Sequence, residues 1–541
     1  MKHTIYKVFA GLLLIGSISC TANYMDINSN PYQPGSLSSD DYGLGSAMNA
    51  LAGCVVSPDV NTAQFTDCLL GGTQGGYLAD AKDAWKATIS NYNPTDDWSR
   101  VFLKSAHIIP VLFANLNTIR IFSEQNGNPI PYAIARVIKV AAMHRVADTF
   151  GPIPYSQIGA DGKIATPYDP LDKVYSEFFD ELDEAIAILT ENQNSALIST
   201  ADYIYGGDVK KWIRFANSLK LRLAMRIVYT DFTSSEGKTP RQLAEEAVSH
   251  EIGVITSNAD NAAWSYFDTT PNPMHTAVNY NKMDKHTDGS VCTTSGDSHA
   301  AADIICYMNG YADPRRSAYF TKSEWPDAEY VGLRRGIVIP AHSEVGHKYS
   351  GPAIKSSAPL YWLNAAEVAF LRAEGKAVFG FDMGGAAKDF YNEGIRLSFE
   401  QWGIDGAEEY LANSERIPET YADPYNNSYL TPLSEISVKW DEGATKEQMQ
   451  ERIIIQKWIA NWLLGNEAWA DYRRTGYPHL IPATSDGNKS GGEVDSKRGA
   501  RRMRYPLDEY VSNGRNVEYA VANYLNGPDK MSTDLWWDCK H

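Results

Sequence analysis

Cysteine is scarce in this sequence, and its placement argues against a metal centre. The 541 residues include six cysteines, and no two of them form a CxxC pair. Structural zinc sites take most of their ligands from such pairs and from closely spaced histidines. The nearest histidine groupings are His286 and His299 around Cys292, and His342 and His347 around Glu344. Neither grouping has the spacing of a metal site, so we predict no metal and expect no cofactor.

Basic residues are also in the minority. The chain has 49 Lys and Arg against 66 Asp and Glu, which gives a formal net charge of −17. A surplus of negative charge repels the phosphate backbone of a nucleic acid. The densest basic group is Lys497, Arg498, Arg501, Arg502 and Arg504. We expect this group to pair with the acidic surplus, and we predict no nucleic-acid binding.

Short catalytic signatures are absent. The sequence contains no G-x-S-x-G, H-E-x-x-H or G-x-x-x-x-G-K motif, which removes the positive evidence for hydrolase, metalloprotease and nucleotide chemistry. Glycoside hydrolysis needs two carboxyl groups across the sugar bond. The densest carboxylate group, Asp180, Glu181, Asp183 and Glu184, lies on one predicted helix opposite apolar residues, which indicates a solvated face. We predict a non-enzyme, with a secreted glycan hydrolase as the competing hypothesis.

Long hydrophobic runs are missing except at the N-terminus. Residues 8–18 are largely apolar, follow Lys2, His3 and Lys7, and end at Cys20. The run is shorter than the roughly 20 residues of a membrane span but fits a secretory signal. We predict a signal peptide over 1–19, lipidation of Cys20 and a flexible tether over 20–35. Ser17 replaces the usual lipobox leucine, so an ordinary signal peptide with an incidental Cys20 is the alternative.

An exported chain meets an oxidising compartment, where cysteines pair. Cys54 with Cys68, and Cys292 with Cys306, are possible local disulfides of similar loop length. Cys539 has no obvious partner.

Helical periodicity dominates the rest of the chain. Apolar residues recur at three- and four-residue steps over 98–124, 132–150, 171–189, 210–228, 241–250, 362–379, 386–402 and 448–469. Consecutive segments form amphipathic pairs near the tetratricopeptide length of about 34 residues, and such pairs must stack to bury their faces. We predict a mainly α fold, with one domain over 36–541 and helical pairs in about 99–250 and 360–470. Five tryptophans at helical spacing are expected in the core: Trp212, Trp362, Trp458, Trp462 and Trp469.

Residues 258–351 lose this period and are rich in Gly, Pro, Asn and aromatic residues. Loops of such length are uncommon in compact domains unless they are functional, so we predict that they carry the ligand face. Sugars bind by stacking their apolar faces on aromatic rings, with polar groups at the rim. The candidate glycan-binding residues, all aromatic and in predicted loops, are Tyr77, Trp85, Trp264, Tyr266, Phe267, Tyr280 and Trp325.

Several motifs together resemble a known family. Residues 145–155, R-V-A-D-T-F-G-P-I-P-Y, resemble the segment that follows a long helix in the SusD/RagB family. We assign Asp148 of this motif a structural role, bonding backbone N–H groups or Arg145, rather than a catalytic one. Further similar segments follow in family order at 168–169, 181–185, 212–226, 313–315, 359–367, 504–506 and 536–538.

The resemblance implies a helical body built on four tetratricopeptide-like pairs, with binding loops on one side. It also implies an outer-membrane lipoprotein that faces the cell exterior and works with a SusC-like TonB-dependent transporter. Ligands in such a family are oligosaccharides in most members and peptides in some. We therefore predict oligosaccharide capture and delivery, with peptide binding by the same architecture as the alternative.

Overall fold

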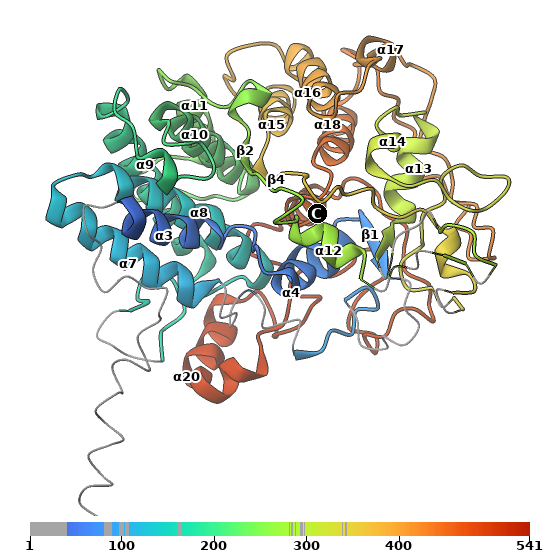
Figure 1. Cartoon of the computed structure of the whole chain (residues 1–541), viewed down its shortest axis with the longest axis horizontal. Helices are drawn as coiled ribbons and strands as arrows, with labels where there is room; N and C mark the ends of the chain where they lie inside the picture. Colours follow the sequence, from blue (N-terminus) through green and yellow to red (C-terminus); the bar gives the residue numbers. More distant parts are fainter. Residues whose placement is uncertain are drawn as a thin grey trace, which may run out of the picture.

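The computed structural model describes residues 41–80, 89–96, 102, 108–159, 165–280, 282, 285, 286, 288–292, 296, 298–337, 339, 340 and 343–540. These residues form a mainly helical protein with a few three- and four-residue strands, which confirms the predicted fold class. Figure 1 shows helices α7 to α11 gathered at one end and α13 and α14 among irregular loops at the other. No helix in the described ranges is both long and apolar enough to cross a membrane.

The N-terminal half supplies the first helical pairs. Its elements are α3 (Asp41–Ala52), α4 (Val60–Ala63), the π-helix η1 (Gln64–Gly72), α7 (Ile109–Asn126), α8 (Ile130–Phe150), α9 (Leu171–Glu191), the 3-10 helix η3 (Ser199–Ala201), α10 (Val209–Arg226) and α11 (Pro240–Ser249). Helices α7 to α11 pack in succession, each against the next. Local signals set their ends: Gly127, with φ 59°, ends α7, and Thr239 forms a capping box that begins α11.

The C-terminal half repeats this construction. Its helices are α15 (Ala365–Ala377), α16 (Ala387–Trp402), α17 (Ala407–Leu411), α18 (Lys446–Ala460), α19 (Gly465–Thr475) and α20 (Leu507–Tyr524). Helix α15 packs against α16, α18 and α10, and so joins the two halves. The five tryptophans expected in the core are all buried, which confirms that prediction.

Two predicted helix boundaries are wrong. The helix expected over 362–379 begins only at Ala365, because residues 360–363 form strand β4. The helix expected over 448–469 is broken between α18 and α19. At this break Leu463 has φ 75°, and a Cβ on Gly465 would lie 2.3 Å from the carbonyl carbon of Gly71. A close backbone approach from a distant segment therefore overrides the local helical pattern.

The segment between the halves contains only short elements among its described residues. They are the 3-10 helix η4 (Asn258–Asp260), β2 (Ala262–Trp264), α12 (Pro273–Val278), β3 (Ser298–Ala300), α13 (Ala302–Gly310), α14 (Arg316–Tyr319), the 3-10 helix η5 (Gly346–Lys348) and β4 (Leu360–Leu363). Strand β2 pairs antiparallel with β4, and β3 pairs antiparallel with β1 (Leu78–Asp80). A small second core lies here, formed by Ala79, Ala301, Val331, Leu333, Ile339 and Tyr349.

The carboxylates of α9 form the predicted solvated face only in part: Glu184 is exposed, but Glu181 and Asp183 pair with buried lysines. Lys139 Nζ lies 2.6 Å from Glu181 Oε1, and Lys220 Nζ lies 2.6 Å from Asp183 Oδ1. Because both lysines come from neighbouring helices and are buried, these carboxylates join α9 to α8 and α10. The basic group near the C-terminus behaves as predicted: Arg498, Arg501, Arg502 and Arg504 all pair with Asp or Glu.

The two predicted disulfides are not formed, and Cys54, Cys68, Cys292 and Cys306 are all thiols. Cys54 Sγ donates to the carbonyl oxygens of Ala50 and Ile108. Cys68 is fully buried within η1, and Cys306 is buried on α13. These sulfurs are packed into the interior, where a thiol behaves as a small apolar group.

Candidate ligand-binding site

A cavity of about 460 Å³ lies where the two helical halves meet. Its walls come from η1, α8, α10, α12, α14, residues 353–362, the end of α16 and the turn from α18 to α19. The break between α18 and α19 is therefore part of the site, because it places Trp462, Leu463 and Leu464 on the cavity wall. The volume is within the usual range for a small-molecule pocket.

The cavity runs from an exposed rim to a charged floor. Ser317, Lys355, Ser357 and Pro359 at the rim are exposed. The lining residues Asp67, His144, Arg145, Arg222 and Glu467 are all buried. A ligand in this cavity therefore meets apolar and aromatic walls, and then ionised groups that are already paired with one another.

Ion pairs hold the charged side chains of the cavity floor in place. Glu467 Oε1 lies 3.0 Å from His144 Nε2, and its other oxygen bonds Arg226. Burial opposes ionisation of this carboxyl, but the charges of Arg222 and Arg226 outweigh burial and hold the pKa of Glu467 well below its ordinary value. Asp67 on the same floor forms an ion pair with Arg145. We assign these groups to holding the floor in shape, because each is neutralised by a partner.

Three polar atoms on cavity-lining residues lack a partner among the described residues. They are Trp362 Nε1, Trp402 Nε1 and Asn466 Oδ1. Buried polar atoms are nearly always hydrogen-bonded, and an exception needs an explanation. The three atoms are covered by neighbouring protein atoms, so a ligand that carries hydroxyl or amide groups would reach them only after these side chains shift.

An aromatic strip of Tyr203, Trp264 and Tyr266 lies next to the cavity wall. The Tyr203 and Trp264 ring centroids are 5.7 Å apart, and those of Trp264 and Tyr266 are 6.4 Å apart with nearly parallel planes. Tyr203 is 56% exposed. Trp264 on β2 faces Leu360 on β4, and Leu360 with Tyr361 lines the cavity. The two-stranded sheet thus connects the strip to the cavity.

Tyr266 links the strip more closely to the cavity floor. Its ring is buried and its Oη has no hydrogen-bond partner among the described residues. Burial raises the pKa of Tyr266, and the charge of Asp67 on the cavity floor adds to the effect. The Tyr266 hydroxyl is therefore held protonated, and it is covered by protein in this structure.

The other predicted glycan-binding residues differ in their exposure. Phe267 and Tyr280 are 63% and 60% exposed. Trp325 is half-buried against Tyr349 of the second core. Trp85 lies outside the described residues, as does Cys20.

Tyr77 is a wrong prediction. Its ring is fully buried between Trp458 and Trp462, and its Oη donates to the carbonyl oxygen of Trp458. The surrounding glycines suggested an exposed loop, but they instead allow residues 71–76 to pack closely against α18 and α19. Tyr77 has no surface left for a ligand.

Asp148 is structural, as predicted, but with different partners. It accepts hydrogen bonds from Tyr175 and Trp537 and pairs with Arg226. Arg145, the partner suggested by sequence, instead bonds Asp67 and the carbonyl oxygen of Val55.

Sequence reasoning missed Tyr203, Tyr361 and Trp402 as site residues. Trp402 ends a segment with helical spacing and Tyr361 directly precedes one, which suggested core packing. Tyr203 lies in a short connection without other signals.

Comparisons with known proteins agree with this architecture. Residues 26–538 match the SusD-like family model, described as SusD and RagB outer membrane lipoprotein. Among curated proteins, none matches the chain.

Solved structures extend the match. A SusD homologue from Bacteroides uniformis is 59% identical, with a TM-score of 0.88, over 93% of this chain and all of that one. A SusD homologue from Bacteroides thetaiotaomicron is 38% identical, with a TM-score of 0.81, over 92% of this chain and all of that one. A chitin-binding SusD homologue from Flavobacterium johnsoniae is 33% identical, with a TM-score of 0.80, over 92% of this chain and 99% of that one.

Proposed function

We propose a function from the premise that this chain belongs to the SusD-like family of outer membrane lipoproteins. The protein is a non-catalytic binding protein of the bacterial cell surface. It captures oligosaccharides and delivers them to a SusC-like TonB-dependent transporter in the outer membrane. Lipidation of Cys20 anchors it there, and the following residues serve as a tether.

One observation carries the binding proposal: an aromatic strip adjoins a cavity whose lining holds unpaired polar atoms. Rings such as Trp264 stack on the apolar face of a sugar, and a shift of the Trp402 side chain brings its covered Nε1 donor to a hydroxyl or acetamido group. Neither feature needs a reacting group. The buried carboxylates of the floor are paired with arginines or histidine, so the site offers no obvious pair of acid and base.

The relationship to a chitin-binding homologue supports an N-acetylated glucosamine oligomer as the first ligand to test. Isothermal titration against chito-oligosaccharides, neutral α- and β-glucans and a peptide library tests the proposal directly. We expect saturable binding to at least one class of oligosaccharide and no release of reducing ends. Binding to peptides alone would replace glycan import by peptide import, and release of reducing ends would establish a hydrolase.

A matched pair of variants tests whether the cavity takes part. Trp402 is half-buried and Trp440 is buried, and both have a covered Nε1 without a partner among the described residues, but of the two only Trp402 lines the cavity. Trp402→Phe removes the donor and keeps a ring. We expect about 2–10-fold weaker binding, as for the loss of one hydrogen bond, while Trp440→Phe binds normally. Equal affinities for the two variants would exclude the cavity from the binding site.

Delivery to a transporter needs a separate test. Deleting the gene for this protein in a host that carries its transporter should abolish growth on the bound oligosaccharide at low concentration. Growth on the corresponding monosaccharide serves as the control. Unchanged growth on the oligosaccharide would contradict a role in import.

A further inference from the structure

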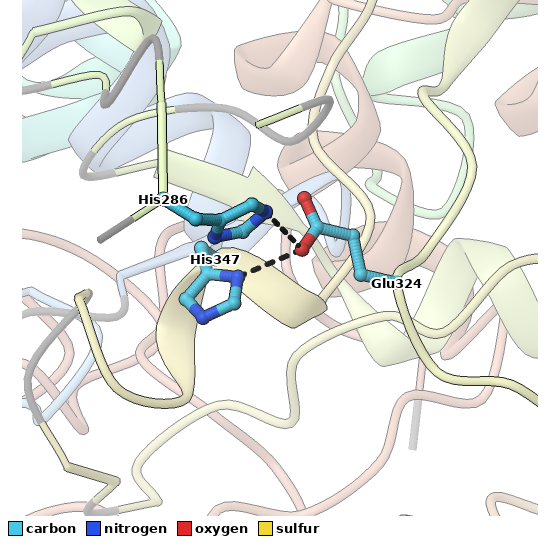
Figure 2. A group of neighbouring side chains, drawn as sticks. All are labelled: His286, Glu324 and His347. Carbon is cyan, nitrogen blue, oxygen red and sulfur yellow. Dashed lines mark hydrogen bonds and ion pairs between the residues drawn. The ribbon is translucent and has the colours of Figure 1, made fainter. Parts of the chain in front are cut away.

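Three residues from separate loops converge outside the ligand-binding site. Glu324 Oε2 lies 2.8 Å from His286 Nε2 and 2.9 Å from His347 Nδ1. Figure 2 shows both imidazole nitrogens directed at the same carboxylate oxygen. The sequence suggested other groupings, of His286 with His299 and of His347 with Glu344, and it gave no sign of this one.

We propose that His286, Glu324 and His347 form a binding site for a divalent transition-metal ion of the zinc class. Two imidazole nitrogens and one carboxylate oxygen are the ligands of many zinc sites that keep a fourth position for water. Nitrogen-rich sets of this kind favour zinc, copper or nickel over calcium and magnesium, which prefer oxygen ligands.

The geometry is close to that of a bound ion. The three potential ligand atoms all lie within 4.8 Å of one another. Ligand atoms about 2.0–2.2 Å from a tetrahedral zinc ion are about 3.3–3.6 Å apart. The two contacts to Glu324, at 2.8 and 2.9 Å, are shorter than this, so both histidines must move away from the carboxylate to admit the ion. The side chains of His286, Glu324 and His347 are 19%, 18% and 8% exposed, so water can reach the group as a further ligand.

Backbone hydrogen bonds fix two of the ligands relative to each other. The Glu324 N–H donates to the carbonyl oxygen of Lys348, which directly follows His347. His347 is part of η5, where Lys348 N–H bonds the carbonyl of Val345. The flanking Trp325 and Val345 pack on the second core. Two of the ligands are therefore placed in advance by folded structure, which lowers the cost of binding.

The third ligand has an outer partner of its own. His286 Nδ1 lies 3.4 Å from Cys292 Sγ. A histidine that ligates through Nε2 carries its proton on Nδ1 and donates it to a neighbouring acceptor. The Cys292 sulfur is in position to accept this hydrogen bond, so Cys292 acts as a positioning residue in this proposal.

A bound ion has a structural consequence for the ligand face. His286 and Cys292 belong to the segment between α12 and β3, and Met274 on α12 lines the cavity. The ion ties this segment to the second core through Glu324 and His347. The metal would thus stiffen the part of the loop-rich side that also carries Tyr280, without contacting a glycan.

Zinc titration of the full chain, without a histidine tag and stripped of metal with EDTA, tests the proposal. We expect one Zn²⁺ per chain by calorimetry and no comparable binding of Ca²⁺ or Mg²⁺. His347→Ala and Glu324→Gln should lower the affinity at least about 10–100-fold, the range for loss of a supporting partner alone. His250→Ala, on a half-buried histidine at the end of α11, is the matched control and should bind normally.

Two further readouts keep the test decisive if a variant folds poorly. Zn²⁺ should raise the thermal midpoint of the wild-type chain but not that of Glu324→Gln, which keeps its shape. Co²⁺ should give the absorption of a tetrahedral nitrogen and oxygen site without a sulfur charge-transfer band. Absence of zinc binding by the wild type, or equal binding by Glu324→Gln, would overturn the site. A sulfur band would overturn this ligand set.

Discussion

The helical interior and the loop-rich side use polar and aromatic residues in opposite ways. Where the two helical halves meet, buried charges are paired: Asp148, Glu367, Glu374, Glu467 and Asp471 each contact arginine or lysine. In the aromatic strip, by contrast, Tyr203 is largely exposed and the Tyr266 hydroxyl lacks a partner among the described residues. The interior pairs these buried charges with one another, whereas the strip leaves the Tyr203 ring exposed for a ligand. Substitutions in the first region should change stability, and substitutions in the second should change binding.

The largest effect on stability is expected from removing Arg226, which belongs to the buried ion pairs where the two helical halves meet. Its guanidinium pairs with Asp148 and Glu467 and is almost fully buried. Arg226→Met leaves two buried carboxylates without this partner, and we expect a loss of about 3–5 kcal/mol in the free energy of unfolding. Urea denaturation measures it. Arg120→Met, which breaks an exposed pair on α7, should change little. Similar losses for both variants would contradict the distinction between the regions.

Acid should lower the stability of the protein by protonating Asp471, which belongs to the same group of buried ion pairs. Burial raises its pKa, but Lys457 and Arg474 outweigh burial and lower the pKa from 3.8 to about 2. A carboxyl whose pKa is depressed by folding stabilises the protein above its unfolded pKa, and this contribution is lost as the pH falls through the folded value.

The corresponding measurement compares wild type and Asp471→Asn between pH 5 and pH 2. We expect the pH-dependent part of their stability difference to be about 2 kcal/mol at pH 5 and to vanish towards pH 2. A difference that stays constant over this interval would show that Asp471 does not titrate as inferred.

Substitutions in the aromatic strip should change ligand binding rather than stability. Trp264→Ala and Tyr203→Ala remove rings that are proposed to stack on sugar, and each should weaken oligosaccharide binding about tenfold, or about 1.4 kcal/mol. Tyr519→Ala on α20 is a matched control for Tyr203, because the two tyrosines are 58% and 56% exposed. Calorimetry measures binding, and thermal unfolding should be nearly unchanged for Tyr203→Ala. Equal affinity of the Tyr203 and Tyr519 variants would remove Tyr203 from the binding site.

The smallest effect is expected from a reducing agent. The four cysteines of the two possible disulfides are thiols in the structure. Dithiothreitol should therefore leave the thermal midpoint unchanged, whereas reduction of a disulfide would typically cost about 2–4 kcal/mol. A fall in the midpoint on reduction would show that the exported protein forms a cross-link after all.

Much of the fold was predictable because its helices follow local rules. The segment expected over 171–189 is α9, residues 171–191, since its apolar positions repeat with helical period. The break before α19 was not predictable, because its cause is the contact of Gly465 with Gly71, almost 400 residues away in the chain. Local sequence patterns predict where the helices occur. Close contacts between distant segments determine where some of these helices end.

The site was predictable only in part, for the same reason. The position of Trp264 in a loop-rich segment predicted a binding role, which stays a prediction, and the structure places its ring next to Tyr203 in the aromatic strip. Tyr77 misled us, because a glycine-rich context resembles a loop until the packing of α18 is known. The grouping of His286, Glu324 and His347 draws one residue from each of three loops, so no sequence spacing could indicate it.

The contact between residues 71–77 and the α18–α19 turn has a consequence for synthesis. Trp458 Nε1 donates to the carbonyl oxygen of Gly75, and Tyr77 donates back to Trp458. A ribosome must therefore add more than 380 further residues before Gly75 and Tyr77 meet this partner. Until then the emerging chain lacks one wall of its central cavity, and a product that stops short of α18 can never close it.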